Sequence, residues 1–209
     1  MDDQKKIWNK IAPSWNKVRQ KTPEIVTNFL KDCSGNILDL GCGSGRNCIN
    51  LGNKKKYFCV DFSRRMLKYA KINLKKNKIN GELVKSESYN IPFKDNFFDH
   101  AICIAVLHCI KTKENRIKTI NEMYRTLKKG QTGLISVWSK NSKILKNKPK
   151  ESEITWKLKR NSVNRFNYTY EEEELRNELE SVGFKVKKSN FKSKQDKYED
   201  NNIIFIVKK

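Results

Sequence analysis

Two aspartates and a glycine-rich turn are the residues of this chain whose types and spacing suit chemistry. Residues 36–45 read Asn-Ile-Leu-Asp-Leu-Gly-Cys-Gly-Ser-Gly, an apolar strand that reaches Asp39 and then enters the turn. Gly41 and Gly43 leave room for a ligand against the backbone and tolerate positive φ angles. Asp61 follows about 20 residues later, after the next apolar run, which is the spacing of a βαβ unit whose second acidic residue binds ribose hydroxyls.

A turn of this kind serves either a dinucleotide or S-adenosylmethionine (SAM). It leads into Ser44-Gly45-Arg46, the expected start of a helix over about residues 44–52, whose free N–H groups would face a polar ligand. The lysine–threonine pair of a phosphate-binding P-loop is missing. Asp39 would repel a pyrophosphate, but it suits the ammonium group of the methionine part of SAM. These features favour SAM.

The elements that must position these residues alternate between strand and helix. This alternation predicts parallel pairing with right-handed crossovers for strands at 36–40, 57–61, 82–85, 98–104 and 132–138. Two more strands, 184–191 and 203–207, are joined without a helix and must be antiparallel. The predicted fold class is α/β, a doubly wound, Rossmann-like, seven-stranded sheet that is mostly parallel with an antiparallel C-terminal edge strand.

We interpret the whole chain, residues 1–209, as one domain. N-terminal helices over 1–34, with a break near Pro13 and an N-cap at Thr22, precede the core at 35–138. Residues 139–168 are rich in Lys and Arg and read as a long basic loop or lid. The last helix and strand pair occupy 169–209.

The amino-acid composition indicates which kinds of molecule the protein could bind. The chain has 209 residues, 37% of them hydrophobic, and a formal net charge of +22. A charge of this size favours binding to polyanions such as nucleic acid. Codon bias in an AT-rich genome explains the lysine excess equally well, and the sequence does not decide between the two.

The cysteine pattern and the hydropathy of the chain indicate the cellular compartment of the protein. The six cysteines show no CxxC spacing and no neighbouring His cluster, so we expect buried free thiols and no metal site. The N-terminus, Met-Asp-Asp-Gln-Lys-Lys, does not resemble a signal peptide, and no apolar run approaches the ~18 residues of a membrane span. A cytoplasmic protein without a membrane partner is expected.

The order of these motifs resembles the class I SAM-dependent methyltransferases over about residues 35–138. Glu87 follows the third strand, and the apolar fourth strand runs into His108, as in that family. The resemblance implies SAM as the cofactor and a set of cofactor-binding residues. These are Asp39, Gly41, Gly43 and Gly45 for the methionine part, Asp61 for the ribose, Phe62 and Met66 beside the adenine, Glu87 and Ser88 at its edge, and Ile104 near the sulfonium.

Segments outside that core are similar to the tRNA wobble-uridine carboxymethyl methyltransferases, which also occur fused in AlkB-type tRNA hydroxylases. The similar segments are 11–15 with Arg19, 102–108, 154–157, 165–170 and 198–201. The resemblance implies SAM-dependent methyl transfer to the carboxylate of a carboxymethyl-modified wobble uridine in tRNA, forming a methyl ester. It places His108, Arg19 and Arg165 at the acceptor, tRNA along residues 140–160, and a small zinc-binding activator subunit at an edge of the sheet.

Two alternatives remain open at this stage. A methyltransferase of small metabolites would use the same core but show a closed, apolar acceptor pocket. A non-catalytic RNA-binding protein could retain the methyltransferase fold without binding SAM. His108 at the end of a strand is also a common packing residue, so its catalytic role is a hypothesis.

Overall fold

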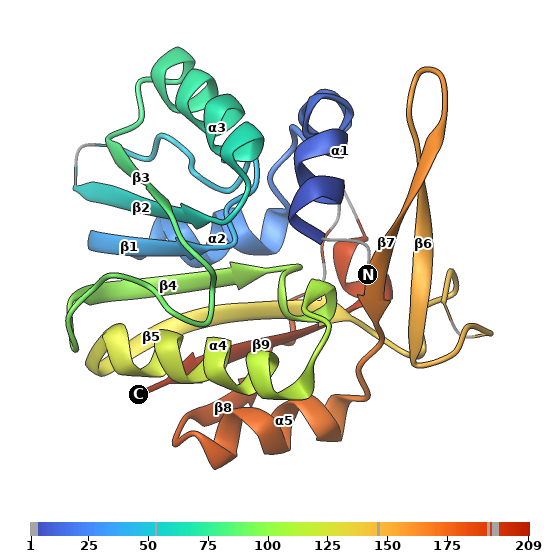
Figure 1. Cartoon of the computed structure of the whole chain (residues 1–209). Coiled ribbons are helices and arrows are strands. Elements are labelled where there is room, and N and C mark those ends of the chain that lie inside the picture. Colours follow the sequence, from blue (N-terminus) through green and yellow to red (C-terminus); the bar gives the residue numbers. More distant parts are fainter. Residues whose placement is uncertain (1–3, 53, 146, 192, 194–196) are drawn as a thin grey trace.

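The computed structural model describes residues 4–52, 54–145, 147–191, 193 and 197–209. Its main sheet has seven strands in the order β3-β2-β1-β4-β5-β9-β8 (Figure 1). The strands are β1 (Gly35–Leu40), β2 (Lys55–Asp61), β3 (Gly81–Lys85), β4 (Phe98–Ile104), β5 (Leu127–Trp138), β8 (Lys185–Lys188) and β9 (Asn202–Lys208). Strands β1 to β5 pair in parallel, and β9 pairs antiparallel with β5 and β8. The predicted mostly parallel α/β sheet is confirmed.

The antiparallel strand β9 lies on the expected side of the sheet, one position inside the edge. Its residues Ile203, Ile204 and Phe205 are buried, as a strand covered on both sides requires. Strand β8 forms the edge itself, and its Lys-Val-Lys-Lys sequence is typical of an exposed edge strand. The hydrophobicity of the two segments therefore explains their order.

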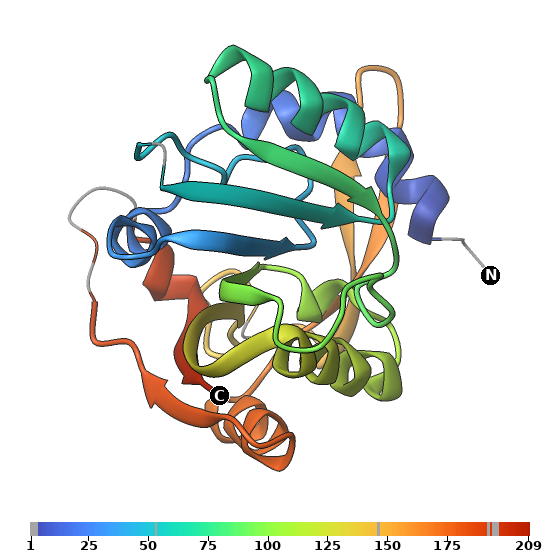
Figure 2. The same ribbon diagram turned by 90° about the vertical axis from the view of Figure 1, so that its left-hand side faces the viewer.

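Helices cover both faces of the sheet (Figures 1 and 2). Alternating strand residues point to opposite faces. Ile37 packs in the hydrophobic cluster that contains residues of α2 (Glu24–Lys31) and α3 (Arg64–Lys76). Leu38 packs in the cluster that contains residues of α4 (Lys113–Thr126) and α5 (Glu172–Ser181). The described residues contain no helix long and apolar enough to cross a membrane, and the cytoplasmic location stays a prediction.

The helix predicted over residues 44–52 is wrong, because this segment forms turns between β1 and β2. Gly45 has φ +79° and Gly52 has φ +94°, values that a right-handed helix does not contain. A Cβ atom on Gly45 would lie 3.3 Å from the Cα atom of Ala70. The turn therefore packs closely against α3, and glycine is the residue that permits this contact.

The N-terminal helices differ from the prediction in two details. Helix α1 (Gln4–Val18) continues through Pro13, where a break was expected. A proline costs the helix one backbone hydrogen bond, and the complete burial of Ile11 and Ala12 against Met66 offsets this cost. Helix α2 has Pro23 as its N-cap residue, so the predicted N-cap is wrong by one position.

The segment 139–168, predicted as a basic loop, contains an antiparallel hairpin of β6 (Glu151–Lys157) and β7 (Ser162–Tyr168). Figure 1 shows this hairpin standing beside α1 at one end of the sheet. Trp156 Nε1 donates a hydrogen bond of 2.8 Å to Ser14 Oγ of α1. The hairpin and the N-terminal helix thus meet at the end of the sheet where β1 and β4 finish.

Candidate functional site

A cavity of about 280 Å³ lies between the carboxyl ends of β1, β2 and β4 and helix α1. This volume is near the lower end of the roughly 300–1,000 Å³ typical of small-molecule sites. Its position is the one at which open parallel α/β sheets bind ligands. The lining includes most residues predicted for the cofactor, namely Gly41, Gly43, Asp61, Phe62, Met66, Glu87, Ser88 and Ile104.

Asp61 at the end of β2 binds the glycine-rich turn. Its Oδ2 atom accepts a hydrogen bond of 2.9 Å from the backbone N–H of Gly43, and Oδ1 accepts one of 2.8 Å from Ser63. Each carboxylate oxygen accepts more than one hydrogen bond, so both keep capacity for ligand hydroxyl groups. Burial raises the pKa of Asp61 to about 6. The carboxylate is therefore ionised at neutral pH but close to its titration range.

Two buried acceptors lie at the other end of the turn. Asp39 is fully buried, and its Oδ2 atom accepts a hydrogen bond from Cys48 Sγ at 3.7 Å. Among the described residues, Asp39 Oδ1 and Asn47 Oδ1 have no hydrogen-bond partner. Burial raises the pKa of Asp39. A buried acceptor without a partner is costly, and a ligand ammonium group at this end would relieve that cost.

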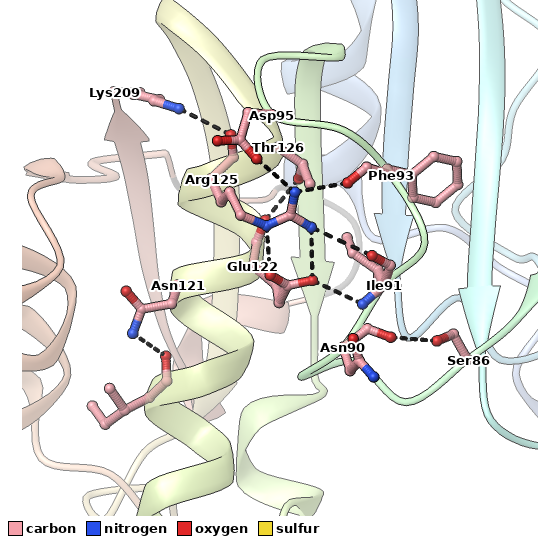
Figure 3. A network of polar contacts seen from close by, with 11 residues as sticks. Ser86, Asn90, Ile91, Phe93, Asp95, Asn121, Glu122, Arg125, Thr126 and Lys209 are labelled. Carbon is pink, nitrogen blue, oxygen red and sulfur yellow. Dashed lines mark hydrogen bonds and ion pairs between the residues drawn. The ribbon is translucent and has the colours of Figure 1, made fainter.

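The loop that contributes Glu87 is fixed to α4 by a network of polar contacts (Figure 3). Glu122 Oε2 accepts a hydrogen bond of 2.8 Å from the N–H of Ile91, and Arg125 donates one of 2.7 Å to the carbonyl of Phe93. The Glu87 carboxylate in turn forms an ion pair with Lys5 of α1. This side of the cavity is therefore held from α4 and from α1 together.

The backbone of Gly41 lies close to the side chain of Val106, and both residues line the cavity. Gly41 has φ +75°, and a Cβ atom there would lie 2.4 Å from Val106 Cγ2. Ala105, in the same cavity wall, has φ +61°, a left-handed value that is strained for alanine. Its N–H donates a hydrogen bond of 2.9 Å to the carbonyl of Ser136. Strained residues cluster at functional sites, and this one could not be recognised from the sequence.

Arg165 of β7 does not line the cavity itself, but it lies in an aromatic cage that includes two lining residues, Trp8 and Trp15. Its guanidinium carbon is 5.6 Å, 6.0 Å and 5.2 Å from the ring centroids of Trp8, Trp15 and Trp138. The side chain is buried, its Nη1 atom donates to Cys109 Sγ at 3.7 Å, and its Nε atom has no partner among the described residues. The cage orients a buried guanidinium by cation–π contacts.

Three arginines, Arg19, Arg46 and Arg165, lie near one another, and Arg46 lines the cavity. Arg19 lies over Trp15 at 5.5 Å. Burial, followed by the positive charges of Arg46 and Arg165, lowers the pKa of the Arg19 guanidinium. None of the three forms an ion pair with another described residue. Such a concentration of guanidinium groups favours the binding of carboxylate or phosphate.

Comparison with known proteins identifies the family. The model of the family described as "Methyltransferase domain" matches residues 37–130. The chain is 32% identical over 163 residues to the tRNA (carboxymethyluridine(34)-5-O)-methyltransferase of Schizosaccharomyces pombe, covering 74% of this chain and 67% of that protein. The chain belongs to this family of SAM-dependent methyltransferases.

Other relatives show how much of the family the chain covers. It is 35% identical over 139 residues to the Saccharomyces cerevisiae enzyme of the same name, which is 64% of this chain but 47% of that enzyme. The chain thus spans about half to two thirds of these methyltransferases. The fold is also that of a methyltransferase solved in complex with the Trm112 methyltransferase activator of Haloferax volcanii, with a TM-score of 0.69, 13% identity and 96% of each chain covered.

The cavity of this methyltransferase fits SAM, the cofactor of the family. Asp61 offers acceptors for ribose hydroxyls, and Phe62 and Met66 offer apolar surface for an adenine. The unpartnered oxygen of Asn47, which lines the cavity, suits the ammonium group of the methionine part. The predicted Asp39 and Gly45 do not line the cavity, because Asp39 lies beneath the turn and Gly45 packs on α3.

The structure also brings the predicted acceptor residues of the methyltransferase together. His108 lies in the 3-10 turn η1 (Leu107–Cys109) and is buried; its Nδ1 atom accepts a hydrogen bond of 3.2 Å from the N–H of Trp138. Burial and the charge of Arg165 lower the pKa of His108 to about 3. The imidazole is therefore neutral at pH 7, with its proton on Nε2. The described residues contain no group of three or more His, Cys, Asp or Glu side chains that could hold a metal ion.

Several site residues were missed by the sequence reasoning. Trp8 and Trp138 of the cage, and Ala105 and Asn47 of the cavity, carry no local motif that separates them from core residues. Trp156, noted only for its resemblance to a family segment, packs against Trp15 with the ring centroids 5.1 Å apart. The three tryptophans share one signal, their residue type, because tryptophan is frequent at binding surfaces; Ala105 and Asn47 carry none.

Proposed function

We propose that the chain transfers the methyl group of SAM to the carboxylate of a carboxymethyl-modified wobble uridine in tRNA, forming a methyl ester. When bound, SAM supplies an electrophilic methyl group on its sulfonium. The observation that carries this proposal is the pair of arginines, Arg165 and Arg19, packed against Trp8 and Trp15 of the cavity wall. Guanidinium groups bind carboxylates in a bidentate geometry, and the family relatives are named for this acceptor.

The chemistry of a carboxylate acceptor agrees with the state of His108. A carboxylate is ionised and nucleophilic at pH 7, so its methylation needs no general base. His108 is poorly suited to be a base, because Nδ1 already accepts the N–H of Trp138 and Nε2 carries a proton. Protonation is further disfavoured by its pKa of about 3. We assign His108 the role of a neutral donor and packing residue at the acceptor site.

Catalysis then depends on placement and on exclusion of water. The arginines would hold both oxygens of the acceptor carboxylate, and each oxygen would keep a second lone pair for attack on the methyl group that SAM supplies. When two reactants are held in a fixed alignment, the activation free energy of their reaction falls substantially. The tryptophans around Arg165 cover the site with apolar surface and exclude water, which strengthens the electrostatic contacts inside.

The region next to this site suits an RNA substrate. Exposed cations lie on the hairpin and on the segment before it, at Lys143, Lys148, Lys157, Lys159 and Arg160. None of them forms an ion pair with another described residue. Together with the net charge of +22, they support contacts with tRNA phosphates.

We also infer that the protein works with a small zinc-binding activator subunit. The support is the shared fold with the methyltransferase that was solved with the Trm112 activator and the open edges of the sheet at β3 and β8. An added strand would satisfy the free backbone groups of such an edge. The measurement is co-purification of the two chains, and separate elution at micromolar concentration would contradict the inference.

The proposed reaction is tested by label transfer. The protein, with and without the activator, is incubated with methyl-labelled SAM and with tRNA that carries carboxymethyluridine at the wobble position, and the tRNA is digested to nucleosides. We expect label in the methyl ester of that nucleoside and none with unmodified tRNA. Label in another nucleoside, or in small metabolites of a cell extract only, would overturn the proposal.

A further inference from the structure

Helices α1 and α3 lie side by side and form a strongly basic surface (Figure 1). Helix α1 contains four Lys, helix α3 contains six Lys or Arg, and neither helix contains an Asp or a Glu. None of the exposed cations used below forms an ion pair within the part of the chain that the structure describes. These cations, which we call the α1–α3 surface, are Lys6, Lys10 and Lys17 of α1 and Arg65, Lys68 and Lys76 of α3.

Hydrogen bonds fix the two helices to each other. Asn9 Oδ1 of α1 accepts the N–H of Arg65 at 3.0 Å and the hydroxyl of Ser63 at 3.0 Å. Further along both helices, Asn73 Nδ2 donates a hydrogen bond of 2.8 Å to Asn16 Oδ1. The cations of the two helices are therefore carried on one preformed surface, although their like charges repel each other.

The helices on the opposite face of the sheet differ in charge. Helices α4 and α5 together contain five basic and seven acidic residues. A codon bias toward lysine acts on the exposed positions of all helices alike, so it does not explain why acidic residues are absent from one pair of helices and in excess on the other. A positive field on one side of a protein attracts polyanions to that side. The distribution of charge therefore indicates a function for the α1–α3 surface.

The α1–α3 surface is continuous with the acceptor side of the cavity. Helix α1 contributes Trp8 and Trp15 to the cavity lining, and Ser14 binds Trp156 of the hairpin. Figure 1 shows α1 standing between α3 and the β6–β7 hairpin. Helix α3 has 13 residues and is thus about 20 Å long. A polyanion with one end in the cavity would therefore meet α1 first and could continue along α3.

We propose that the α1–α3 surface binds the phosphate backbone of a double-helical part of the tRNA, outside the anticodon loop. The proposal rests on tRNA being the substrate of the proposed function. Double-stranded RNA is recognised mostly through its shape, its phosphates and its 2′-hydroxyl groups. Lysine and arginine side chains bind phosphates without reading the base sequence. The α1–α3 surface thus adds affinity for tRNA in general, while the modified nucleoside is selected at the cavity.

The test is filter binding of the full chain to two RNAs. One is full-length tRNA that carries carboxymethyluridine, and the other is a single-stranded oligonucleotide with the sequence and modification of its anticodon loop. When Arg65, Lys68 and Lys76 are replaced together by glutamine, the Kd for tRNA should rise about tenfold, since each exposed charge contact changes an affinity by a few fold. The dependence of the logarithm of the association constant on the logarithm of the salt concentration should become shallower by about one for each phosphate that is no longer bound. The Kd for the oligonucleotide should stay unchanged.

The matched control replaces Lys129, Lys185 and Lys187, exposed lysines of β5 and β8, by glutamine. It removes the same net charge as the α1–α3 variant. We expect it to bind tRNA within about twofold of the wild type and with the same salt dependence. Calorimetry with SAM checks that both variants keep the cofactor site.

Each other outcome has a definite meaning. The proposal is overturned if the α1–α3 variant binds tRNA as the wild type does, or if the control variant loses as much affinity. An equal loss for the oligonucleotide overturns it too, because the contact then lies at the anticodon loop. A variant that keeps tRNA binding but no longer binds phosphatidylserine vesicles shows a membrane-binding surface instead. If tRNA binding is lost selectively but the wild type transfers no methyl group to tRNA, the α1–α3 surface stands and the proposed function fails.

Discussion

Asp61 gives the sharpest prediction about cofactor binding. Its two oxygens each accept one backbone N–H, from Gly43 at 2.9 Å and from Ser63 at 2.8 Å. Replacing it by asparagine keeps the shape but removes the charge and turns one acceptor into a donor. That donor would face either Gly43 N–H or Ser63 N–H. Asp61→Asn therefore removes acceptors for the ribose and loosens the turn at the same position.

The size of the effect follows from the number of hydrogen bonds to the ribose. Two charged hydrogen bonds, at roughly 1.5 kcal/mol each, amount to about 3 kcal/mol. Since 1.4 kcal/mol corresponds to a factor of ten, the Kd for SAM should rise by about 100-fold. Asp32→Asn, at an exposed aspartate after α2, is the matched control and should leave the Kd unchanged.

The Kd for SAM, measured over a series of pH values, separates the effect of the Asp61 charge from the effect of the side chain's shape. Burial raises the pKa of Asp61 to about 6, so protonation on going below that pH removes the acceptor that the ribose needs. About one tenth of the group is ionised near pH 5, and the Kd of the wild type should be about tenfold higher there than near pH 7.5. The neighbouring Asp39 also has a raised pKa, so the prediction concerns the part of the pH dependence that Asp61→Asn abolishes.

Calorimetry with SAM on the wild type, Asp61→Asn and Asp32→Asn measures all of these values. The reasoning would be refuted by an Asp61→Asn variant that stays folded and binds SAM within threefold of the wild type. It would equally be refuted by wild-type and Asp61→Asn proteins whose affinities fall in parallel between pH 7.5 and pH 5.

Three further predictions concern the rest of the site. Arg165→Ala should leave the Kd for SAM within about twofold of the wild-type value. It should lower methyl transfer to tRNA by at least tenfold, since a charged hydrogen bond to the acceptor is removed. A parallel loss of SAM binding in calorimetry would show that Arg165 is structural. Ala105→Gly should raise the free energy of unfolding by about 0.5–1 kcal/mol. Glycine removes the strain of φ +61°, and this gain is larger than its cost in backbone entropy. An unchanged or lower midpoint in thermal denaturation would contradict the strain at Ala105. Joint replacement of Lys157, Lys159 and Arg160 by glutamine should weaken tRNA binding. In filter binding, the slope of the logarithm of the association constant against the logarithm of the salt concentration should fall by about one for each phosphate that is no longer bound. A slope equal to that of the wild type would exclude phosphate binding by these residues.

The fold was predictable because its signals are local and repeated. Apolar strands that alternate with amphipathic helices specify the parallel sheet, and Ser63, a residue type that favours helix starts, caps α3 by accepting the N–H of Met66. The helix over 44–52 was predicted wrongly because the conformations of Gly45 and Gly52 depend on packing against α3 and on the chain around them. The β6–β7 hairpin was missed because Ile154 and Trp156 are the only large apolar residues of β6, too few to show a clear alternation.

Spacing along the sequence predicted only the cofactor half of the site, and the acceptor residues His108, Arg19 and Arg165 were named from the family resemblance alone. Asp61 and the glycines lie within one βαβ unit, so their spacing along the sequence already describes their geometry. The cage around Arg165 is built from Trp8 of α1, Trp138 of β5 and a strand of the hairpin, which the topology alone brings together. The strain at Ala105 depends on the same tertiary packing. No local pattern encodes such distant contacts.

The most direct measurement of the central claim uses the lability of an ester. tRNA with carboxymethyluridine is incubated with methyl-labelled SAM and the protein, with and without the proposed activator, and the purified tRNA is treated with mild alkali. A methyl ester is hydrolysed under these conditions and releases labelled methanol, whereas methyl groups on ring atoms or on ribose stay with the RNA. We predict that the label is recovered as volatile methanol, and label that remains on the alkali-treated tRNA would contradict methylation of the carboxylate.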